Sequence, residues 1–152
     1  MTIDTVRPSV RVERTLRAPA EAVFAAWTDV EKLKQWWGPR GINAVAAELD
    51  VRPGGAYSIT MQPDTGKPFV LSGEYRDVEA PRRIVMTWGY RGEAVKDPVE
   101  SLVTVEFEAH GAATHMVLTQ EFLKEPPDME GRDRGWRSSF DRLDEYLDTT
   151  VD

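Results

Sequence analysis

The C-terminal segment of the chain carries apolar residues at the spacing of an α-helix. This apolar stripe consists of Met129, Trp136, Phe140, Leu143 and Leu147. Asp, Glu and Arg occupy most of the positions between them, so one helix face is apolar and the other charged. Because water disfavours exposed apolar area, this helix is expected to pack against a second apolar surface.

A second pattern, with a period of two, runs through the middle of the chain. Large apolar residues alternate with smaller or more polar ones in Tyr57/Ile59/Met61, Phe69/Leu71/Tyr75, Ile84/Met86/Trp88/Tyr90, Val103/Val105/Phe107 and Met116/Leu118/Phe122. Such alternation is typical of a sheet that is buried on one face. It predicts six strands between Asn43 and about Leu123, and the same pattern predicts an earlier strand over 10–17.

Proline and glycine mark the reversals between these strands. Pro53-Gly54 fits the two central positions of a type II turn. Further reversals are predicted at Pro63–Gly66, Ala80-Pro81 and His110-Gly111, with a longer loop over Gly92–Pro98. Short connections of this kind join consecutive strands into an antiparallel meander.

Two short helices are predicted between the first strand and the meander. Pro19 suits the first turn of the first helix. Thr28, followed three residues later by Glu31, matches a capping box and predicts that the second helix starts there. Gly38-Pro39 ends the second helix, and Pro126-Pro127 separates the last strand from the terminal helix.

The order of these elements predicts one α+β domain. We expect residues 1–8 to form a flexible leader and residues 9–150 a single domain. In it, a curved antiparallel sheet wraps around a long C-terminal helix, with two short helices after the first strand. Facing apolar surfaces with such large side chains suggest a hydrophobic cavity between sheet and helix.

Energetics limit the size of that cavity. An empty void costs roughly 24 cal/mol per Å³, so about 300 Å³ would cost around 7 kcal/mol. That is comparable to the whole stability of a typical domain. The space under the helix is therefore expected to be modest, hydrated or occupied by a small ligand.

Composition narrows the range of functions. The chain has 152 residues, a net charge of -7 and no cysteine. A negative protein without a basic cluster is not expected to bind nucleic acid or an anionic membrane surface. The lack of cysteine excludes disulfides and thiol nucleophiles and fits a reducing compartment. With no signal-peptide or membrane-spanning segment recognised, we expect a cytoplasmic protein.

Several motifs together resemble one known family. They are Thr28-Asp29, Trp36-Trp37-Gly38-Pro39, Asp50-Val51-Arg52-Pro53-Gly54-Gly55, Thr87-Trp88, and Gly135-Trp136 followed by Leu143 and Leu147. In this order they resemble the activator of Hsp90 ATPase homologue 1-like family of the START-like (SRPBCC) superfamily. The resemblance implies a helix-grip fold, often with a cavity. It differs at Gln120, where many relatives carry a histidine, and the eukaryotic activators have a separate N-terminal domain that this sequence lacks.

Three functions are compatible with this fold, because a fold does not determine a function. The favoured prediction is binding of a small hydrophobic or aromatic molecule inside the cavity. The first alternative, implied by the family resemblance alone, is a co-chaperone-like module with an Hsp90-type partner. The second is a small enzyme of cyclase or hydrolase type. No cofactor is expected, and the protein is expected to be a monomer or a homodimer.

Candidate ligand-binding residues share the inward face of the sheet or the inner side of the terminal helix. They are Arg14, Trp37, Tyr57, Ile59, Phe69, Leu71, Tyr75, Met86, Trp88, Val105, Met116, Leu118, Gln120, Trp136, Ser139, Phe140 and Leu143. Arg14 and Gln120 are the expected polar anchors, because a buried polar group needs a partner. For Arg14 a structural role is the alternative, and for the aromatic residues it is simple core packing. Gly135 is expected to allow close packing of helix on sheet, with room for a ligand as the alternative.

Other polar residues are expected to lie on the surface. The two histidines, His110 and His115, show no triad or zinc-site spacing. The acidic residues of the terminal helix are expected to be solvated. No catalytic residue or metal ligand is therefore predicted, although an inward tyrosine near Arg14 could polarise a carbonyl group.

Overall fold

A computed structural model describes residues 8–91, 100–124, 126 and 128–150. The elements are β1 (Ser9–Leu16), α1 (Ala20–Thr28), α2 (Val30–Leu33), β2 (Ile42–Leu49), β3 (Ala56–Pro63), β4 (Phe69–Glu79), β5 (Arg83–Arg91), β6 (Ser101–His110), β7 (Ala113–Phe122) and α3 (Met129–Thr150). Their order confirms the prediction of one strand, two short helices, six strands and a long helix. The leader over 1–8 and the loop over 92–98 lie outside the described residues, apart from Pro8.

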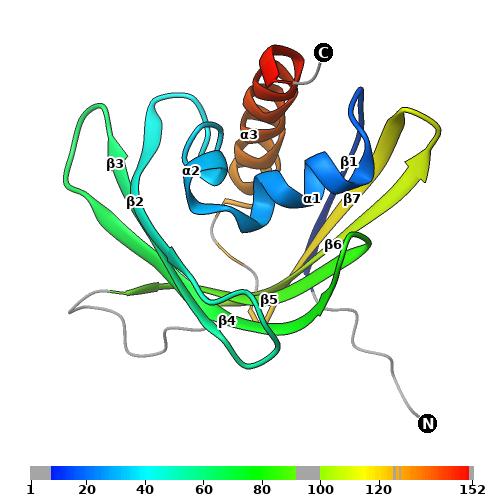
Figure 1. The fold of residues 1–152 in the computed structure, drawn as a ribbon. Coiled ribbons are helices and arrows are strands. Elements are labelled where there is room, and N and C mark those ends of the chain that lie inside the picture. The colour runs from blue at the N-terminus through cyan, green and yellow to red at the C-terminus, as the bar shows by residue number, and fades with distance from the viewer. Residues whose placement is uncertain (1–7, 92–99, 125, 127, 151–152) are drawn as a thin grey trace, which may run out of the picture.

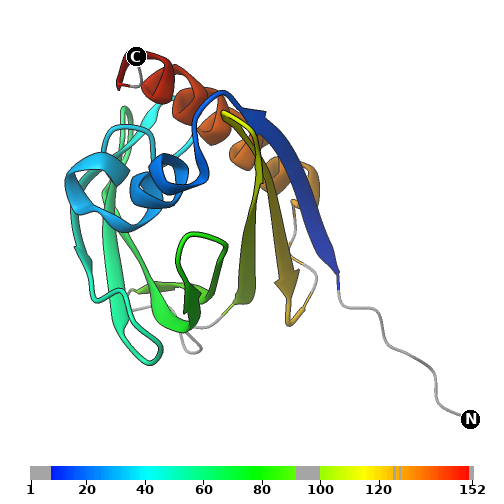
Figure 2. The ribbon, with the colours of Figure 1, turned by 45° about the vertical axis from the view of Figure 1, so that its right-hand side comes forward.

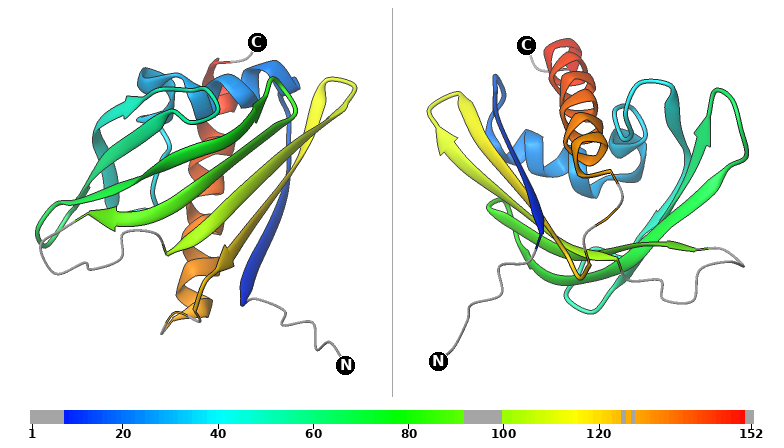
Figure 3. Two further views of the ribbon diagram at one scale, coloured as in Figure 1. Left: turned by 90° about the horizontal axis from the view of Figure 1, so that it is seen from below. Right: turned by 180° about the vertical axis from the view of Figure 1, so that it is seen from behind.

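The strands form one antiparallel sheet in the order β1-β7-β6-β5-β4-β3-β2. Strands β2 to β7 are a meander, and β1 pairs with β7 so that Arg14 lies opposite Met116. The sheet curves into a trough, and α1 and α2 bridge its two arms in front of α3 (Figure 1). Seen from behind, α3 lies nearest the viewer between the same two arms (Figure 3, right). This is the predicted α+β helix-grip arrangement.

The inner face of the trough and the stripe of α3 form one apolar core. Along β7 every second residue is buried, from Thr114 to Phe122. On α3 the residues Trp136, Phe140, Leu143 and Leu147 are buried against this face. The helix also packs against β1, and Figure 2 shows the two elements side by side. The view from below, onto the outer face of the sheet, shows α3 behind the strands (Figure 3, left).

Aromatic rings connect the three helices at the centre of this core. The ring of Trp27 in α1 lies 5.0 Å from that of Trp36 and 5.3 Å from that of Trp37, both just after α2. The same ring lies 6.2 Å from the rings of Trp136 and Phe140 in α3. The Trp36 indole N–H donates to the carbonyl oxygen of Ala26 at 3.0 Å. The Trp27 ring also lies 6.2 Å from that of Phe107 in β6, so this cluster positions α3 relative to the sheet.

Two predicted turns have the expected geometry. In the turn Arg52–Gly55 the Gly55 N–H donates to the Arg52 carbonyl at 2.8 Å, and Gly54 has a φ of 86°. A positive φ at this position defines the predicted type II turn and favours glycine. Gly111, with a φ of 62°, closes the hairpin between β6 and β7.

The predicted capping box of the second helix is wrong by one residue. Thr28 is the last residue of α1, and its hydroxyl donates back to the Phe24 carbonyl at 3.0 Å. Asp29 instead caps α2, because its carboxylate accepts the Lys32 N–H at 3.1 Å. Only Asp29 separates the two helices, so the capping role falls to the residue with extended backbone between them.

Candidate functional site

A pocket opens to solvent between the N-terminal half of α3 and the sheet. Its volume is about 190 Å³. The sheet contributes Met61 from β3, Phe69 and Leu71 from β4, Trp88 and Tyr90 from β5, and Gln120 from β7. The opposite walls come from α3 and from the segment that connects α2 to β2. The pocket is modest in size, within the limit expected from the energetic cost of a void.

The α3 wall is built from residues one turn apart. It consists of Gly131, Arg132, Gly135, Trp136 and Ser139, which follow the i, i+4 spacing of a single helix face. A Cβ atom built on Gly135 would meet no atom within 4 Å. The prediction of close helix–sheet packing at Gly135 is therefore wrong, since the space beside this glycine is open.

The segment from Trp37 to Asn43, which leads from α2 into the first residues of β2, forms a second wall, and α3 fastens it in place. Trp37, Gly38, Pro39 and Ile42 line the pocket. The guanidinium of Arg142 donates to the carbonyls of Gly38 at 2.9 Å and Ile42 at 3.2 Å, and to the Asn43 side-chain oxygen at 3.1 Å. Burial lowers the pKa of Arg142 from its ordinary value.

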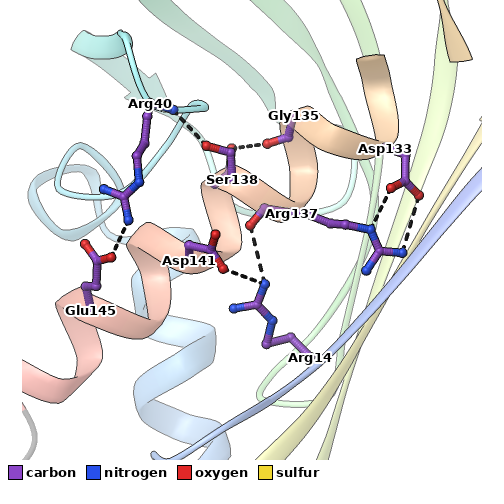
Figure 4. Close-up of polar contacts among 9 residues, drawn as sticks. Arg14, Arg40, Asp133, Gly135, Arg137, Ser138, Asp141 and Glu145 are labelled. Carbon is purple, nitrogen blue, oxygen red and sulfur yellow. Dashed lines mark hydrogen bonds and ion pairs between the residues drawn. The ribbon is translucent and has the colours of Figure 1, made fainter. Parts of the chain in front are cut away.

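Arg40 fastens the same segment from outside the pocket. Its backbone N–H donates to the Ser138 hydroxyl at 2.9 Å, and its guanidinium pairs with Glu145. The hydrogen bond and ion pair with Glu145 raise the pKa of Arg40. Figure 4 shows this contact on one side of α3 and the Arg14 contact with Asp141 on the other.

Gln120 is the polar group at the inner wall. Its side-chain oxygen accepts the Trp136 indole N–H at 2.8 Å, and its amide N–H donates to the Ser101 hydroxyl at 2.8 Å. Gln120 is only 1% exposed. The network joins β6, β7 and α3, and it satisfies polar groups that would otherwise be buried without partners.

Arg132 lies on the pocket wall one turn before Trp136. Its Nη1 is 2.5 Å from a carboxylate oxygen of Glu100, and its guanidinium lies over the rings of Tyr90 and Phe122, at 5.7 and 5.5 Å from their centroids. The Tyr90 hydroxyl also accepts a long hydrogen bond from the Trp88 indole, at 3.4 Å. Burial raises the pKa of Tyr90, so its hydroxyl stays protonated at neutral pH.

Apart from Arg14, the ligand-binding residues predicted from the sequence fall into three groups in the structure. Seven line the pocket, namely Trp37, Phe69, Leu71, Trp88, Gln120, Trp136 and Ser139. Tyr57, Ile59, Tyr75 and Met86 surround a deeper void of only about 10 Å³. Val105, Met116, Leu118, Phe140 and Leu143 are fully buried core residues outside the lining of either space. The deeper void is too small for anything beyond a single water molecule.

Arg14 lies outside the pocket, at the seam between β1 and α3. Its guanidinium donates to Asp141 at 2.8 Å and to the Arg137 carbonyl at 3.4 Å (Figure 4). Because β1 is the edge strand on which α3 packs, the Arg14 side chain meets the helix at this seam. Asp141 is thus paired, and the acidic residues Glu145 and Asp148 of α3 also contact arginines.

The two histidines lie on the outer side of the sheet. The ring of His115 contacts Glu13 at 2.9 Å, and this hydrogen bond is the main cause of the lowered pKa of Glu13. His110 contacts Glu108 at 2.7 Å. Within the described part of the chain, no group of three His, Cys, Asp or Glu side chains could hold a metal ion.

Several pocket residues were not predicted from the sequence. They are Gly38, Pro39, Ile42, Met61, Tyr90, Gly131 and Arg132. Met61 and Tyr90 alternate in phase with strand neighbours that were predicted to bind the ligand. The strand pattern therefore already indicated that both side chains point inward. Arg132 continues the helical stripe one turn before Trp136, as a charged residue at an inward position. The residues between α2 and β2 carry no periodic signal.

Among the helices that the structure describes, none is long and apolar enough to cross a bilayer.

Comparisons with known proteins point to one family. The family model described as activator of Hsp90 ATPase homolog 1-like protein matches residues 17–148. No curated protein matches the chain.

Solved structures show the same fold. The AHSA1 protein from Silicibacter pomeroyi is 29% identical, with 94% of this chain and 99% of that chain covered and a TM-score of 0.83. An uncharacterised protein from Rhizobium leguminosarum is 31% identical, with coverage of 94% and 95% and a TM-score of 0.79. A protein from Nitrosomonas europaea is 24% identical, with coverage of 97% and 98% and a TM-score of 0.82. The chain therefore belongs to the activator of Hsp90 ATPase homolog 1-like family.

Proposed function

We propose that this protein binds a small apolar or aromatic molecule in the pocket between α3 and the sheet. The main support is the position of Gly135. This glycine lies in the interior of α3, with open space where its Cβ would be. Glycine in a helix interior costs about 1 kcal/mol relative to alanine. This destabilising residue stands on the pocket wall, where any side chain would project into the pocket.

The pocket's size and lining support the same function. Because the pocket opens to solvent, its volume of about 190 Å³ holds water when no ligand is bound, and an apolar ligand would displace that water from an apolar lining. The indoles of Trp37, Trp88 and Trp136 supply flat apolar surfaces, and aromatic walls with a few polar groups are typical of small-molecule sites.

The chemistry of the lining favours binding over catalysis. A hydrolase or cyclase needs a group that accepts a proton near neutral pH. The titratable side chains among the described lining residues are those of Tyr90 and Arg132. Burial raises the pKa of Tyr90, and a guanidinium stays protonated, so neither supplies a general base at neutral pH.

The test is a binding measurement with a neutral aromatic probe, 2-naphthalenemethanol. Isothermal titration calorimetry measures the binding, because a naphthalene ring absorbs and emits in the same range as the three indoles that line the pocket and would mask their fluorescence. We expect a saturable change with one site per chain for the wild type. Gly135→Leu should abolish it, since the new side chain fills the space.

The matched control is Arg134→Leu, which adds the same side chain at the neighbouring position on the exposed side of α3. This variant should bind the probe like the wild type. A non-saturable response, or equal binding by Gly135→Leu and wild type, would exclude the pocket as the binding site. A co-chaperone role, suggested by the family description alone, predicts instead a complex with an Hsp90-type chaperone and a changed ATPase rate.

A further inference from the structure

We propose that the ligand of this pocket carries a carboxylate and that Arg132 binds it. The inference rests on the proposed function and adds the chemical class of the ligand, an apolar acid. The observation behind it is the combination of one cation, three indoles and a neutral amide around one small space.

Arg132 is the one charged side chain among the described lining residues. It occupies an inward position, four residues before Trp136 and seven before Ser139, where an apolar residue would continue the stripe of α3. The Arg132 side chain is 27% exposed, so its guanidinium is partly removed from water at the pocket wall. A cation in such a place favours an anionic partner more strongly than a fully exposed one.

The guanidinium is held in one orientation. The rings of Tyr90 and Phe122 lie at 5.7 and 5.5 Å from its central carbon, which restricts its position. Its polar contact within the described part of the chain is a single one, from Nη1 to one oxygen of Glu100. An arginine has five N–H donors in a planar fork, so further donors are available for a second carboxylate.

Two further features bear on an anion at this position. Arg132 and Gly131 lie in the first turn of α3, where the helix dipole favours negative charge, although the Gly131 N–H already donates to the Asp128 carboxylate at 2.8 Å. Glu100 acts in the opposite sense, because its carboxylate neutralises part of the Arg132 charge and would repel a ligand anion. The Glu100 contact also demonstrates that a carboxylate can approach this guanidinium closely.

Glu100 and the ligand would compete for Arg132. This competition distinguishes a ligand-binding Arg132 from one that only forms a structural ion pair with Glu100. Removing either partner of a structural pair weakens stability in the same direction. If Arg132 binds the ligand, the two variants must change acid binding in opposite directions. Arg132→Gln should weaken it, and Glu100→Gln should strengthen it.

The experiment compares two probes of similar shape, 2-naphthoate and 2-naphthalenemethanol, by isothermal titration calorimetry at pH 7.5. For the wild type we expect the acid to bind at least tenfold more tightly than the alcohol. Arg132→Gln should reduce this preference to less than twofold while the alcohol still binds. Arg132→Lys should retain part of it, because an ammonium keeps the charge without the fork.

The outcomes separate this inference from the proposed function. Equal binding of acid and alcohol by the wild type, or a preference unchanged in Arg132→Gln, overturns the carboxylate inference and leaves the pocket's binding role standing. Binding of neither probe counts against the proposed function itself. Acid binding that survives Gly135→Leu shows that the acid binds outside the pocket, which also overturns the inference. If Arg132→Gln does not fold, the other two variants test the inference. Glu100→Gln should then bind the acid more tightly than the wild type, and Arg132→Lys should retain only part of the preference for the acid.

Discussion

Gln120 shows how a single polar residue is accommodated in the apolar wall of the pocket. It stands on the inward face of β7 and is 1% exposed, yet both ends of its amide have partners. Its position opposite Val10 in the β1–β7 pairing makes it part of the sheet core. The amide therefore orients Trp136, whose ring forms part of the α3 wall.

Replacing Gln120 by leucine should lower the free energy of unfolding by about 1–3 kcal/mol, because the Trp136 N–H and the Ser101 hydroxyl lose their partners. Urea denaturation followed by circular dichroism measures the change. Thr119→Val, at the neighbouring position on the other face of β7, is the control and should stay within about 0.5 kcal/mol of wild type. Equal effects of the two substitutions would contradict the role given to the amide.

Gly135→Ala should have the opposite effect on stability. Since the new methyl group meets no atom, the variant gains up to about 1 kcal/mol from helix propensity alone. The same methyl group enters the pocket, so affinity for 2-naphthalenemethanol should fall. The denaturant midpoint measures the change in stability, and a calorimetric titration of the same preparation measures the change in affinity. A loss of stability would mean that this glycine serves the packing of the helix.

At the scale of the elements, α3 forms one wall of the pocket and fastens the wall beside it. Arg142 donates to three backbone carbonyls and to the Asn43 side chain, all in the segment from Trp37 to Asn43 that leads from α2 into β2. Arg40, in the same segment, forms an ion pair with Glu145 of α3. Most ion pairs along α3 are well exposed, and such pairs contribute little to stability. The Arg142 contacts differ because their acceptors are carbonyls in a partly buried place.

Arg142→Ala should therefore cost more than Arg40→Ala, although both lose contacts of the same segment. We expect about 1.5–3 kcal/mol for Arg142, in the range of hydrogen bonds to charged groups, and a smaller effect for Arg40, whose ion pair with Glu145 is exposed to solvent. Urea denaturation gives the two values. Hydrogen exchange at the Ile42 amide, which donates to the Pro39 carbonyl, should accelerate in Arg142→Ala. Equal losses of stability in the two variants would show that the partly buried Arg142 contacts contribute no more than the exposed ion pair of Arg40.

At the scale of the whole molecule, burial of tyrosines links stability to alkaline pH. Burial raises the pKa values of Tyr57, Tyr75 and Tyr90 above the ordinary 10.0. Above pH 10 the unfolded chain releases these protons while the folded chain keeps them. The unfolded state then binds fewer protons, so the free energy of unfolding falls as pH rises. The contribution is fully present below pH 10 and is lost above it.

We expect the free energy of unfolding to be nearly constant between pH 8 and 9.5 and to decrease steeply above pH 10, as measured by urea denaturation. Tyr57→Phe removes one of the linked groups, so its slope above pH 10 should be shallower. At neutral pH the same variant should be less stable, because the hydroxyl of Tyr57 donates to the Thr87 carbonyl at 2.5 Å. An unchanged alkaline slope would show that Tyr57 does not contribute to the linkage.

The periodicities of the sequence already determined the order of the elements and the faces they bury. The alternation along β7 and the stripe of α3 are local patterns, and a chain of this composition can satisfy them only by placing one surface over the other. The type II turn at Pro53-Gly54 was equally local. The start of α2 was predicted one residue early, because Thr28 and Asp29 are both common N-cap residues and only the backbone between the helices selects Asp29.

Which inward residues pack tightly and which leave space was decided only by the tertiary structure. Tyr57 and Tyr75 enclose almost no volume, whereas Trp88 and Trp136 face an open pocket, although all four have the same parity or stripe signal. The difference arises from how α3 lies across the trough, which depends on the aromatic contacts of Trp27 and on Arg142. Sequence patterns specify the direction of a side chain, but the volume beside it depends on residues distant along the chain.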